Sequence, residues 1–360
     1  SAAGRESGLI GTVETRIGEE VITSKRTTPE SSDLQALSAV MRERHMRNLV
    51  MEVSSHAIAL ERIRGSHFAV VAFTNLSQDH LDFHKTMQAY FEAKAKLFSY
   101  EFADLAVINI DDSYGIKLAE LTELPVMTVS RHDQSATWHY TSISKDYVGA
   151  HVAIRGSAGI LIEGKVHLHG GYNFDNLLMA VAIATESGID PIDIAAILPQ
   201  LTGAVGRLDA VRLGQNFTAL VDYAHSPDAV TRVLETAREI SDGRVIAVLG
   251  CGGDRDTSKR SLMGKALQDG ADVAIYTSDN PRSEKADAIL VQMTLGLEIH
   301  EPSAVIEDRA DAIRAAVNEA QEGDVVLVLG KGHEKGQEIN GTVHPFDDRV
   351  ELARAIEDKK

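Results

Sequence analysis

Residues 72–98, AFTNLSQDHLDFHKTMQAYFEAKAKLF, contain a strand end, a polar loop and a helix in direct succession. The apolar run at 68–74 predicts a buried strand, and the loop after it is rich in Asp and His. A helix is expected at 86–99, because apolar side chains recur there at three- and four-residue intervals. Strand, loop and helix in this order form the repeating unit of a doubly wound α/β sheet.

Lys94 lies on the apolar stripe of this helix, whereas Lys96 falls on the solvated face. A buried ammonium is unfavourable unless it is paired, neutral or chemically altered. Alone, Lys94 is explained by a packed aliphatic stem whose amine reaches water. The preceding loop, however, carries His80, and a second strand end nearby carries Glu52. A carboxylate, an imidazole and a lysine-derived group could together hold a divalent cation such as magnesium.

Length and composition indicate two domains and limit the partners. The 360 residues are enough for two ordinary domains with full cores. Acidic residues outnumber basic ones by 53 to 36 and no basic cluster stands out, so nucleic acid and anionic membranes are poor partners. The single cysteine, Cys251, excludes an internal disulfide and fits a reducing compartment, and no apolar run approaches membrane-spanning length. We therefore expect a cytoplasmic protein.

The first half of the chain alternates strands and helices, which predicts a mostly parallel, doubly wound sheet. A helix opened by a Ser/Asp cap is expected at 33–46. Further strands and helices are expected at 48–53, 104–109, 111–121, 125–130, 174–188 and 191–199. Short alternating strands at 137–169 predict an antiparallel flank. The segment 202–216 looks like a junction, so we place one domain at 1–207 and the other at 208–360.

The second domain repeats the strand–helix alternation, which predicts another doubly wound sheet. Strands are expected at 217–222, 244–249, 272–277, 303–306 and 325–329, and helices at 227–240, 259–269, 283–297, 309–320 and 347–357. Four of these strands are followed by polar loops with Gly or Pro: DYAHSP, GCGGDRD, SDNPR and GKGHE. Ligands of open α/β sheets bind beyond the carboxyl ends of the strands, so the four loops are expected to face one crevice.

Three of these loops, GCGGDRD, SDNPR and GKGHE, suit a zwitterionic amino acid. Arg255 and Arg282 can bind a carboxylate, Asn280 can contribute an amide, and Glu334 can bind an amine. The alternative for SDNPR is a β-turn with surface charges. GCGGDRD is not G-x-G-x-x-G, so on its own it is equally well a tight turn.

The remaining polar positions suggest a nucleotide, with structural alternatives. Asp222 could bind a ribose hydroxyl, and Tyr223 and His225 could contact a base, although such residues at a strand end are more often structural. Arg207 at the junction could reach a phosphate. Asn173 and Asn176 stand at a helix start, where an N-cap explains one of them.

Taken together, these motifs resemble those of the Mur ligases, ATP-dependent amide-bond-forming enzymes of peptidoglycan assembly. The resemblance is carried by TTP, MEVSSH, FTNLSQDHLDFH, YFEAKAKLF, GGYNFDN, VGRLD, DYAHSP, GCGGDRD, SDNPR and GKGHE, which span nearly the whole chain. It is strongest to the type that adds the third residue of the stem peptide. It implies a P-loop-type central domain followed by a Rossmann-like C-terminal domain, acting as a monomer.

The resemblance also implies a role for each motif. Contacts with the UDP-N-acetylmuramoyl dipeptide fall on Thr27, Thr28, Ser54 and Arg62. The residues that would bind Mg²⁺ and take part in catalysis are Glu52, His80 and a carbamylated Lys94. The residues that would bind ATP are Asn173, Asn176, Arg207, Asp222, Tyr223 and His225, and Arg207 would also be catalytic. The residues that would bind the incoming diamino acid are Arg255, Asn280, Arg282, Gly330 and Glu334.

Arg282 in the DNPR motif favours meso-diaminopimelate, whose second carboxylate needs an arginine. A lysine- or ornithine-adding ligase is the first alternative, and a folylpolyglutamate synthase-like ligase is the second. Two alternatives come from other classes: a non-catalytic nucleotide or amino-acid binding module, and a dehydrogenase-like pair of Rossmann units. The absence of G-x-G-x-x-G opposes the dehydrogenase.

The sequence also departs from the family pattern. The phosphate loop G-T-x-G-K-T/S and the domain that binds uridine are absent, and the chain opens on SAAGRES, interpreted as a helix end leading through a Gly turn into a strand. We expect these 360 residues alone to be nearly inactive and the complete protein to be a ligase. Leu60 stands where some relatives have a polar contact, and Asp209 replaces a more usual Glu.

Overall fold

The computed structural model describes residues 4–146, 149–168, 170–201 and 206–359, which form two compact units. The first unit comprises Ser1–Ser77, Phe83–Leu168 and Asn173–Leu201. The second comprises Gln78–Asp82, His169–Tyr172 and Thr202–Lys360. Residues 1–3 and 202–205, where the expected N-terminal helix end and the junction begin, lie outside the described residues.

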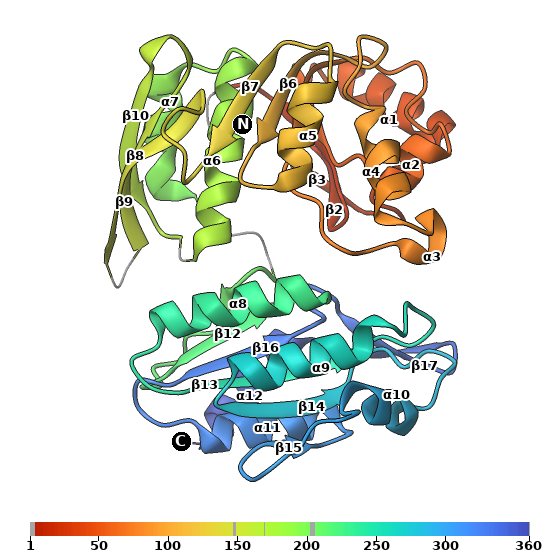
Figure 1. The fold of residues 1–360 in the computed structure, drawn as a ribbon, viewed down its shortest axis with the longest axis vertical. Coiled ribbons are helices and arrows are strands. Elements are labelled where there is room, and N and C mark those ends of the chain that lie inside the picture. The colour runs from red at the N-terminus through yellow and green to blue at the C-terminus, as the bar shows by residue number, and fades with distance from the viewer. Residues whose placement is uncertain (1–3, 147–148, 169, 202–205, 360) are drawn as a thin grey trace. The chain divides into compact units, whose positions relative to one another are not determined.

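A small mixed sheet opens the first unit (Figure 1). Its strands are β1 (Ser7–Ile10), β2 (Glu14–Ile17), β3 (Glu20–Thr23) and β4 (Asn48–Met51), in the order β3-β2-β1-β4. Only β1 and β4 run parallel. Helix α1 (Ser31–Glu43) follows β3, and its N-cap is Glu30 without a side-chain hydrogen bond, so the expected Ser/Asp cap is wrong. The described residues before β1 are not helical either.

The larger sheet of the first unit has the order β10-β9-β8-β7-β6-β5. Strands β5 (Phe68–Phe73), β6 (Ala103–Asn109), β7 (Val126–Ser130) and β8 (Trp138–Asp146) run parallel. Strands β9 (Gly149–Arg155) and β10 (Leu161–Val166) add an antiparallel flank to β8. The structure therefore confirms the parallel sheet with an antiparallel flank.

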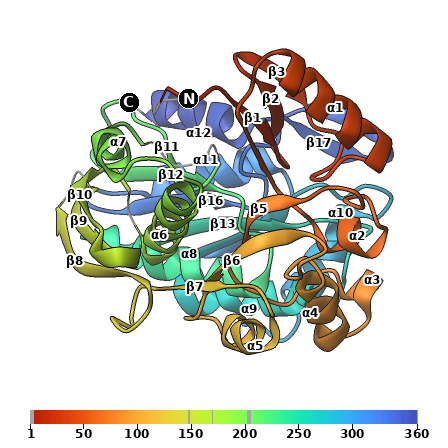
Figure 2. The same ribbon diagram turned by 90° about the horizontal axis from the view of Figure 1, so that it is seen from above.

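Helices cover both faces of this sheet. Helices α2 (Ser55–Ala59), α4 (Met87–Ala95) and α5 (Ser113–Leu121) share a core with β5 and β6 that includes Phe91 and Leu118. Helices α6 (Gly171–Glu186) and α7 (Pro191–Ile197) pack with β8 to β10 around Phe174 and Leu178, at the edge seen in Figures 1 and 2. A short helix, α3 (Leu81–His84), interrupts the expected loop before α4, so the acidic and imidazole-rich loop ends earlier than expected.

The second unit is a three-layer α/β sandwich. Strands β12 (Thr218–Asp222), β13 (Val245–Cys251), β14 (Val273–Ser278), β15 (Ala304–Val305) and β16 (Val325–Leu329) are parallel, in the order β12-β16-β13-β14-β15. The two-residue strand β11 (Asp209–Ala210) pairs antiparallel with β12. Alternate strand residues face opposite layers, so the near-continuous apolar runs fill two cores at once.

Each core of the second unit has its own helices. Helices α8 (Pro227–Ile240), α9 (Lys259–Gly270) and α10 (Ala286–Met293) pack on the residues Leu220, Ala247 and Leu327. Helices α11 (Arg309–Glu319) and α12 (Asp348–Lys359) pack on the opposite face. Register aligns Asp222 with Leu329, Leu329 with Leu249, and Cys251 with Ser278, so the four strands end within two residues of one another.

One element of the second unit was not anticipated. Strands β17 (Gly336–Ile339) and β18 (Thr342–Pro345) form a separate antiparallel hairpin. Its turn is Asn340-Gly341, and both residues have positive φ, at 50° and 74°. Asn-Gly is the preferred pair for such a two-residue hairpin turn, so the signal was present in the sequence.

None of the helices in the described residues is both long enough and apolar enough to cross a membrane.

Candidate functional site

The four loops singled out in the sequence meet at one cavity of about 250 Å³ in the second unit. Each loop follows a parallel strand, so the aligned strand ends bring the loops together. The lining includes residues expected to bind the amino acid and the nucleotide: Tyr223, His225, Arg255, Asn280, Arg282, Gly330 and Glu334. The expected convergence of the loops is thus observed.

The cavity carries the charges that a zwitterionic ligand requires. Arg255 and Arg282 supply guanidinium groups, and Glu334 supplies a carboxylate. Cys251 also lines the cavity, but burial raises the pKa of its thiol to about 12, so it is neutral at physiological pH.

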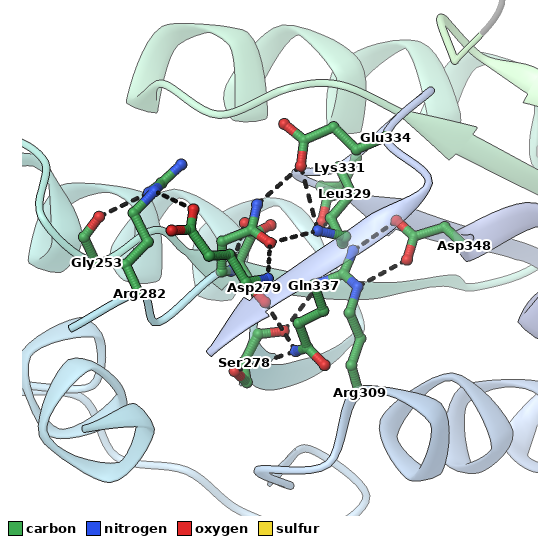
Figure 3. Close-up of polar contacts among 12 residues, drawn as sticks. Gly253, Ser278, Asp279, Arg282, Arg309, Leu329, Lys331, Glu334, Gln337 and Asp348 are labelled. Atoms are coloured by element: carbon green, nitrogen blue, oxygen red, sulfur yellow. Dashed lines mark hydrogen bonds and ion pairs between the residues drawn. The ribbon is translucent and has the colours of Figure 1, made fainter. Parts of the chain in front are cut away.

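The hairpin positions Arg282, whose φ of 53° is unusual for a residue other than glycine. The Arg282 N–H donates to the carbonyl of Glu338 over 2.9 Å, and the Asn340 N–H donates to the carbonyl of Arg282 over 2.7 Å. The side chain is held as well: Nη1 donates to the Gly253 carbonyl over 2.7 Å, and Nε lies 3.3 Å from Glu338 Oε2 (Figure 3). Two segments distant in sequence therefore fix this guanidinium.

A buried arginine braces the glycine-rich loop against the loop after β14. Arg260, 1% exposed, forms a bidentate pair with Glu284 over 2.8 and 2.7 Å and donates to the carbonyl of Gly252. The N–H of Asp254 donates to the same Glu284 carboxylate. The hydrogen bond from Arg260, with that from Asp254, lowers the pKa of Glu284 to about 2. Gly253 is needed here, because an added Cβ would lie 1.9 Å from the carbonyl oxygen of Pro281.

The expected nucleotide residues of the second unit form a compact group. Asp222 is 3% exposed and accepts hydrogen bonds from the N–H groups of Leu208 and Ala224, each over 2.8 Å. Burial raises its pKa, against the lowering effect of these bonds and of Arg207. The Arg207 guanidinium lies 5.0 Å from the centre of the Tyr223 ring. The Asp222 carboxylate is thus already bonded to the backbone at Leu208 and at Ala224, and its contact with a ribose stays a prediction.

His80 belongs to Gln78–Asp82, which groups with the second unit, and it lines the cavity together with Asp79. Burial alone would raise the pKa of Asp79, but contact with His225 and the charges of His80 and Lys259 hold it well below its usual range. His80 has a φ of 55°. A tight turn therefore presents an ionised carboxylate beside two imidazoles.

Four residues expected to contact the nucleotide substrate surround Glu52 in the first unit. The Thr12 N–H and hydroxyl donate to Glu52 Oε2 over 3.3 and 2.5 Å, and the Thr27 hydroxyl lies 3.0 Å from the Thr12 hydroxyl. The Thr28 hydroxyl donates to the carbonyl of Glu52 over 2.9 Å and accepts from the N–H of Ser54 over 3.0 Å.

The other two of these residues also make protein contacts. Arg62 donates to the Thr28 carbonyl and pairs with Glu30 over 3.1 Å. The Ser54 hydroxyl caps α2 by accepting from the N–H of Ala57. The sequence-predicted residues are therefore adjacent, but Thr28 is 1% exposed and its hydroxyl joins two backbone groups. For Thr28 the structure shows a positioning contact, and substrate contact by this group stays a prediction.

Lys94 is half-buried, whereas Lys96 is exposed, as the helix pattern indicated. The Lys94 ammonium lies 5.3 Å from the centre of the Tyr90 ring. Tyr90 stacks on His84 at 5.0 Å, and His84 Nε2 lies 2.9 Å from the Ser55 hydroxyl. Within the described ranges, no three His, Cys, Asp or Glu side chains lie close enough to hold a metal ion. The magnesium site on Glu52, His80 and Lys94 stays a prediction.

Helix α6 begins at Gly171, so Asn173 and Asn176 lie inside its first two turns. Neither residue is the N-cap, and that structural alternative is wrong. Asn173 is 9% exposed, whereas Asn176 is exposed. Their contact with a nucleotide stays a prediction.

Several polar residues at the site were missed by reasoning from the sequence: Asp79, Lys259, Arg260, Arg309 and Lys331. Arg260 and Arg309 lie in the first turns of helices, where the sequence pattern alone predicts solvent-exposed side chains. Lys331 lies within GKGHE, and its position between two glycines was the only available signal.

Comparison with known proteins covers both units. A family described as "Mur ligase middle domain" matches residues 1–184, and one described as "Mur ligase, glutamate ligase domain" matches residues 206–332. A Streptomyces coelicolor protein named UDP-N-acetylmuramoyl-L-alanyl-D-glutamate--2,6-diaminopimelate ligase is 48% identical over 358 residues, which are 98% of this chain and 71% of the relative.

Solved structures are also similar to this chain over nearly its whole length. A ligase of that name matches with a TM-score of 0.67 and 35% identity, over 98% of this chain and 73% of the other. A Mycobacterium tuberculosis folylpolyglutamate synthase complexed with ADP also has a TM-score of 0.67, over 91% of this chain and 82% of the other. At 17% identity, the latter comparison shows a shared fold alone.

Proposed function

The chain belongs to the Mur ligase family, and from this we propose that it adds meso-diaminopimelate to UDP-N-acetylmuramoyl-L-alanyl-D-glutamate, using ATP, in the synthesis of peptidoglycan precursors. The observation that carries the proposal is the cavity of the second unit, where Arg255, Arg282 and Glu334 meet. Diaminopimelate carries an ammonium and a carboxylate at each end, so it offers both charges after one amine has reacted.

The proposed reaction has two steps. The γ-carboxylate of the D-glutamate attacks the γ-phosphorus of ATP, giving an acyl phosphate and ADP. The amine of the diamino acid then attacks the acyl carbon, phosphate leaves, and an amide forms as the amine loses a proton. Charge neutralisation and positioning dominate phosphoryl transfer, which is the role assigned to Arg207.

On the nucleotide side, the proposal assigns ATP to Asn173, Asn176, Arg207, Asp222, Tyr223 and His225. The clustering of Asp222, Tyr223 and Arg207 supports this assignment. Thr27, Thr28, Ser54 and Arg62 are assigned to the UDP-linked substrate, supported by their adjacency around Glu52.

Magnesium is assigned to Glu52, His80 and Lys94. The carboxylate of Glu52 suits this ion, whereas the Lys94 ammonium would repel it. Lys94 therefore fits the ion only after carbamylation has turned its amine into an anion. Bound there, Mg²⁺ would neutralise charge on the transferring phosphoryl group. We further propose a cytoplasmic monomer, in line with the acidic composition and single cysteine.

A substrate screen on the complete ligase tests the diamino acid. Each of meso-diaminopimelate, L-lysine and L-ornithine is supplied with ATP and the UDP-linked dipeptide, and the product is identified by mass. We expect kcat/KM to favour meso-diaminopimelate by at least about 100-fold, because an unpaired arginine would be left in the cavity with lysine. Equal use of lysine would refute the assignment.

Replacing Lys94 with Ala tests the metal assignment. We expect turnover to fall severely and to recover in part when a small carboxylate is added. Wild-type kinetics in the Lys94→Ala variant would remove Lys94 from the mechanism.

A further inference from the structure

Lys331 is a buried cation beneath the cavity to which the proposed function gives no role. It follows Gly330, directly after β16, and it is 0% exposed. Removing an ammonium from water is unfavourable unless its three N–H donors find acceptors. Its acceptors are therefore informative about what it does.

The first acceptor is the side chain of Asn280. Lys331 Nζ donates to Asn280 Oδ1 over 2.9 Å, and the backbone N–H of Glu338 donates to the same oxygen over 2.9 Å. An ammonium and a backbone N–H can only donate, so the oxygen of the amide must face them. Two donors on one side therefore fix the orientation of the amide, and Nδ2 must point the other way.

The second acceptor is Glu334. Asn280 Nδ2 donates to Glu334 Oε2 over 2.8 Å, and Lys331 Nζ lies 3.2 Å from the same oxygen. Figure 3 shows this oxygen receiving both contacts while the second carboxylate oxygen of Glu334 points away from them. Because Glu334 lines the cavity and its side chain is 33% exposed, the free oxygen remains available to a ligand.

We propose that Lys331 is a positioning residue for the incoming amino acid. By holding Asn280 Oδ1 and Glu334 Oε2 together, it presents one Glu334 oxygen to the ammonium of the ligand in a fixed place. Without Lys331 the Asn280 oxygen loses one of its two donors, and the Glu334 side chain loses one of its two fixed contacts. This inference rests on the proposed function, since it takes the cavity to be the amino-acid site.

The test compares Lys331→Met with Lys335→Met in the complete ligase. Methionine keeps an unbranched stem and removes the charge and the donors, and Lys335 is an exposed lysine four residues along the same segment. We expect Lys331→Met to raise KM for meso-diaminopimelate about 10- to 100-fold, the usual effect of losing a charged hydrogen bond. KM for ATP and for the UDP-linked dipeptide should stay within about two-fold, and Lys335→Met should match the wild type.

A double-mutant cycle separates positioning from a general loss of structure. In a Glu334→Gln background, Lys331→Met should raise KM for the amino acid by less than about three-fold further, because the oriented carboxylate is already gone. If Lys331→Met does not fold, Lys331→Gln takes its place, and the same rise in KM, confined to the amino acid, is expected of it.

An unchanged KM for the amino acid, or an equal rise for all three substrates, would overturn the inference. Failure of the wild-type enzyme to use meso-diaminopimelate would instead overturn the proposed function. The two failures are therefore distinguishable.

Discussion

Replacing Arg309 with Met should destabilise the second unit more than any surface substitution on the same helix. Arg309 and Asp348 form an ion pair whose side chains are both 0% exposed. Two bonds of 2.7 Å join the guanidinium to the carboxylate, and two more reach the carbonyls of Leu329 and Ser278 (Figure 3). The arginine thereby ties together the ends of β16 and β14, which lead into GKGHE and SDNPR.

The magnitude follows from what the substitution leaves behind. Methionine fills much of the volume of the aliphatic part of Arg309, but it leaves the Asp348 carboxylate buried without a charged partner. Removing one partner of a buried ion pair lowers the free energy of unfolding by about 3–5 kcal/mol. The matched control is Arg314→Met, five residues along α11, whose pair with Asp311 is half exposed at 50% and 57%. Such exposed pairs contribute about 0–1 kcal/mol. Arg309→Met combined with Asp348→Leu should regain most of the loss, since no buried charge remains.

Hydrogen exchange read by mass spectrometry measures the effect where it occurs. Peptides from β13 and β16 should exchange about 100- to 5,000-fold faster in Arg309→Met, the range that corresponds to 3–5 kcal/mol. The only tryptophan, Trp138, lies in the first unit, so its fluorescence shows whether that unit remains folded. Equal protection of these strands in Arg309→Met and Arg314→Met would refute the reasoning.

Three further predictions concern single contacts. Gly253→Ala should weaken diamino-acid binding and lower the melting temperature, because its Cβ would lie 1.9 Å from the Pro281 carbonyl oxygen; wild-type affinity by calorimetry would contradict this. The pKa of Glu284 is depressed from 4.5 to about 2, so its ionised form stabilises the fold above pH 4.5, and this contribution is lost as pH falls toward 2. Glu284→Gln should therefore lower stability by about 1–2 kcal/mol at pH 7, allowing for partial exposure, and by less at acid pH; a urea-unfolding gap independent of pH would refute this. Thr28→Val should cost about 1–2 kcal/mol, because it leaves two partly buried backbone groups, the Glu52 carbonyl and the Ser54 N–H, without their hydroxyl partner, whereas Thr27→Val should cost less than about 0.5 kcal/mol by the same measurement.

Local pattern predicted the second unit well for a physical reason. Its strands are apolar on both faces and its helices are bounded by Ser, Asp and Pro, so α8, which starts at Pro227 after the Ser226 cap, was expected with the same bounds. Parallel strands then bring the following loops to one edge, and this is why the sequence alone predicts that the four motifs meet at one site.

Contacts between distant residues could not be predicted in this way. The partner of Arg260 is Glu284, and the partner of Arg309 is Asp348, 39 positions away. Nothing in the local sequence distinguishes these arginines from solvated ones. Strand β3 of the N-terminal sheet was not predicted, although strands after the first Gly turn and at 48–53 were. Every residue of β3 is exposed, so it carries no alternation of buried and exposed positions.

Three cations, each at most 1% exposed, share one arrangement beneath the cavity: Arg260, Arg309 and Lys331. Arg260 joins the glycine-rich loop to Glu284, Arg309 joins the ends of β14 and β16, and Lys331 joins Asn280 to Glu334. Each cation thus bridges segments that reach the cavity from different strands. Each cation also has one acidic partner, which is Glu284, Asp348 or Glu334, and removal of either charge would leave the other unpaired in or near the interior. The cavity is therefore organised before any ligand arrives, and the binding energy of the amino acid need not be used to order these loops.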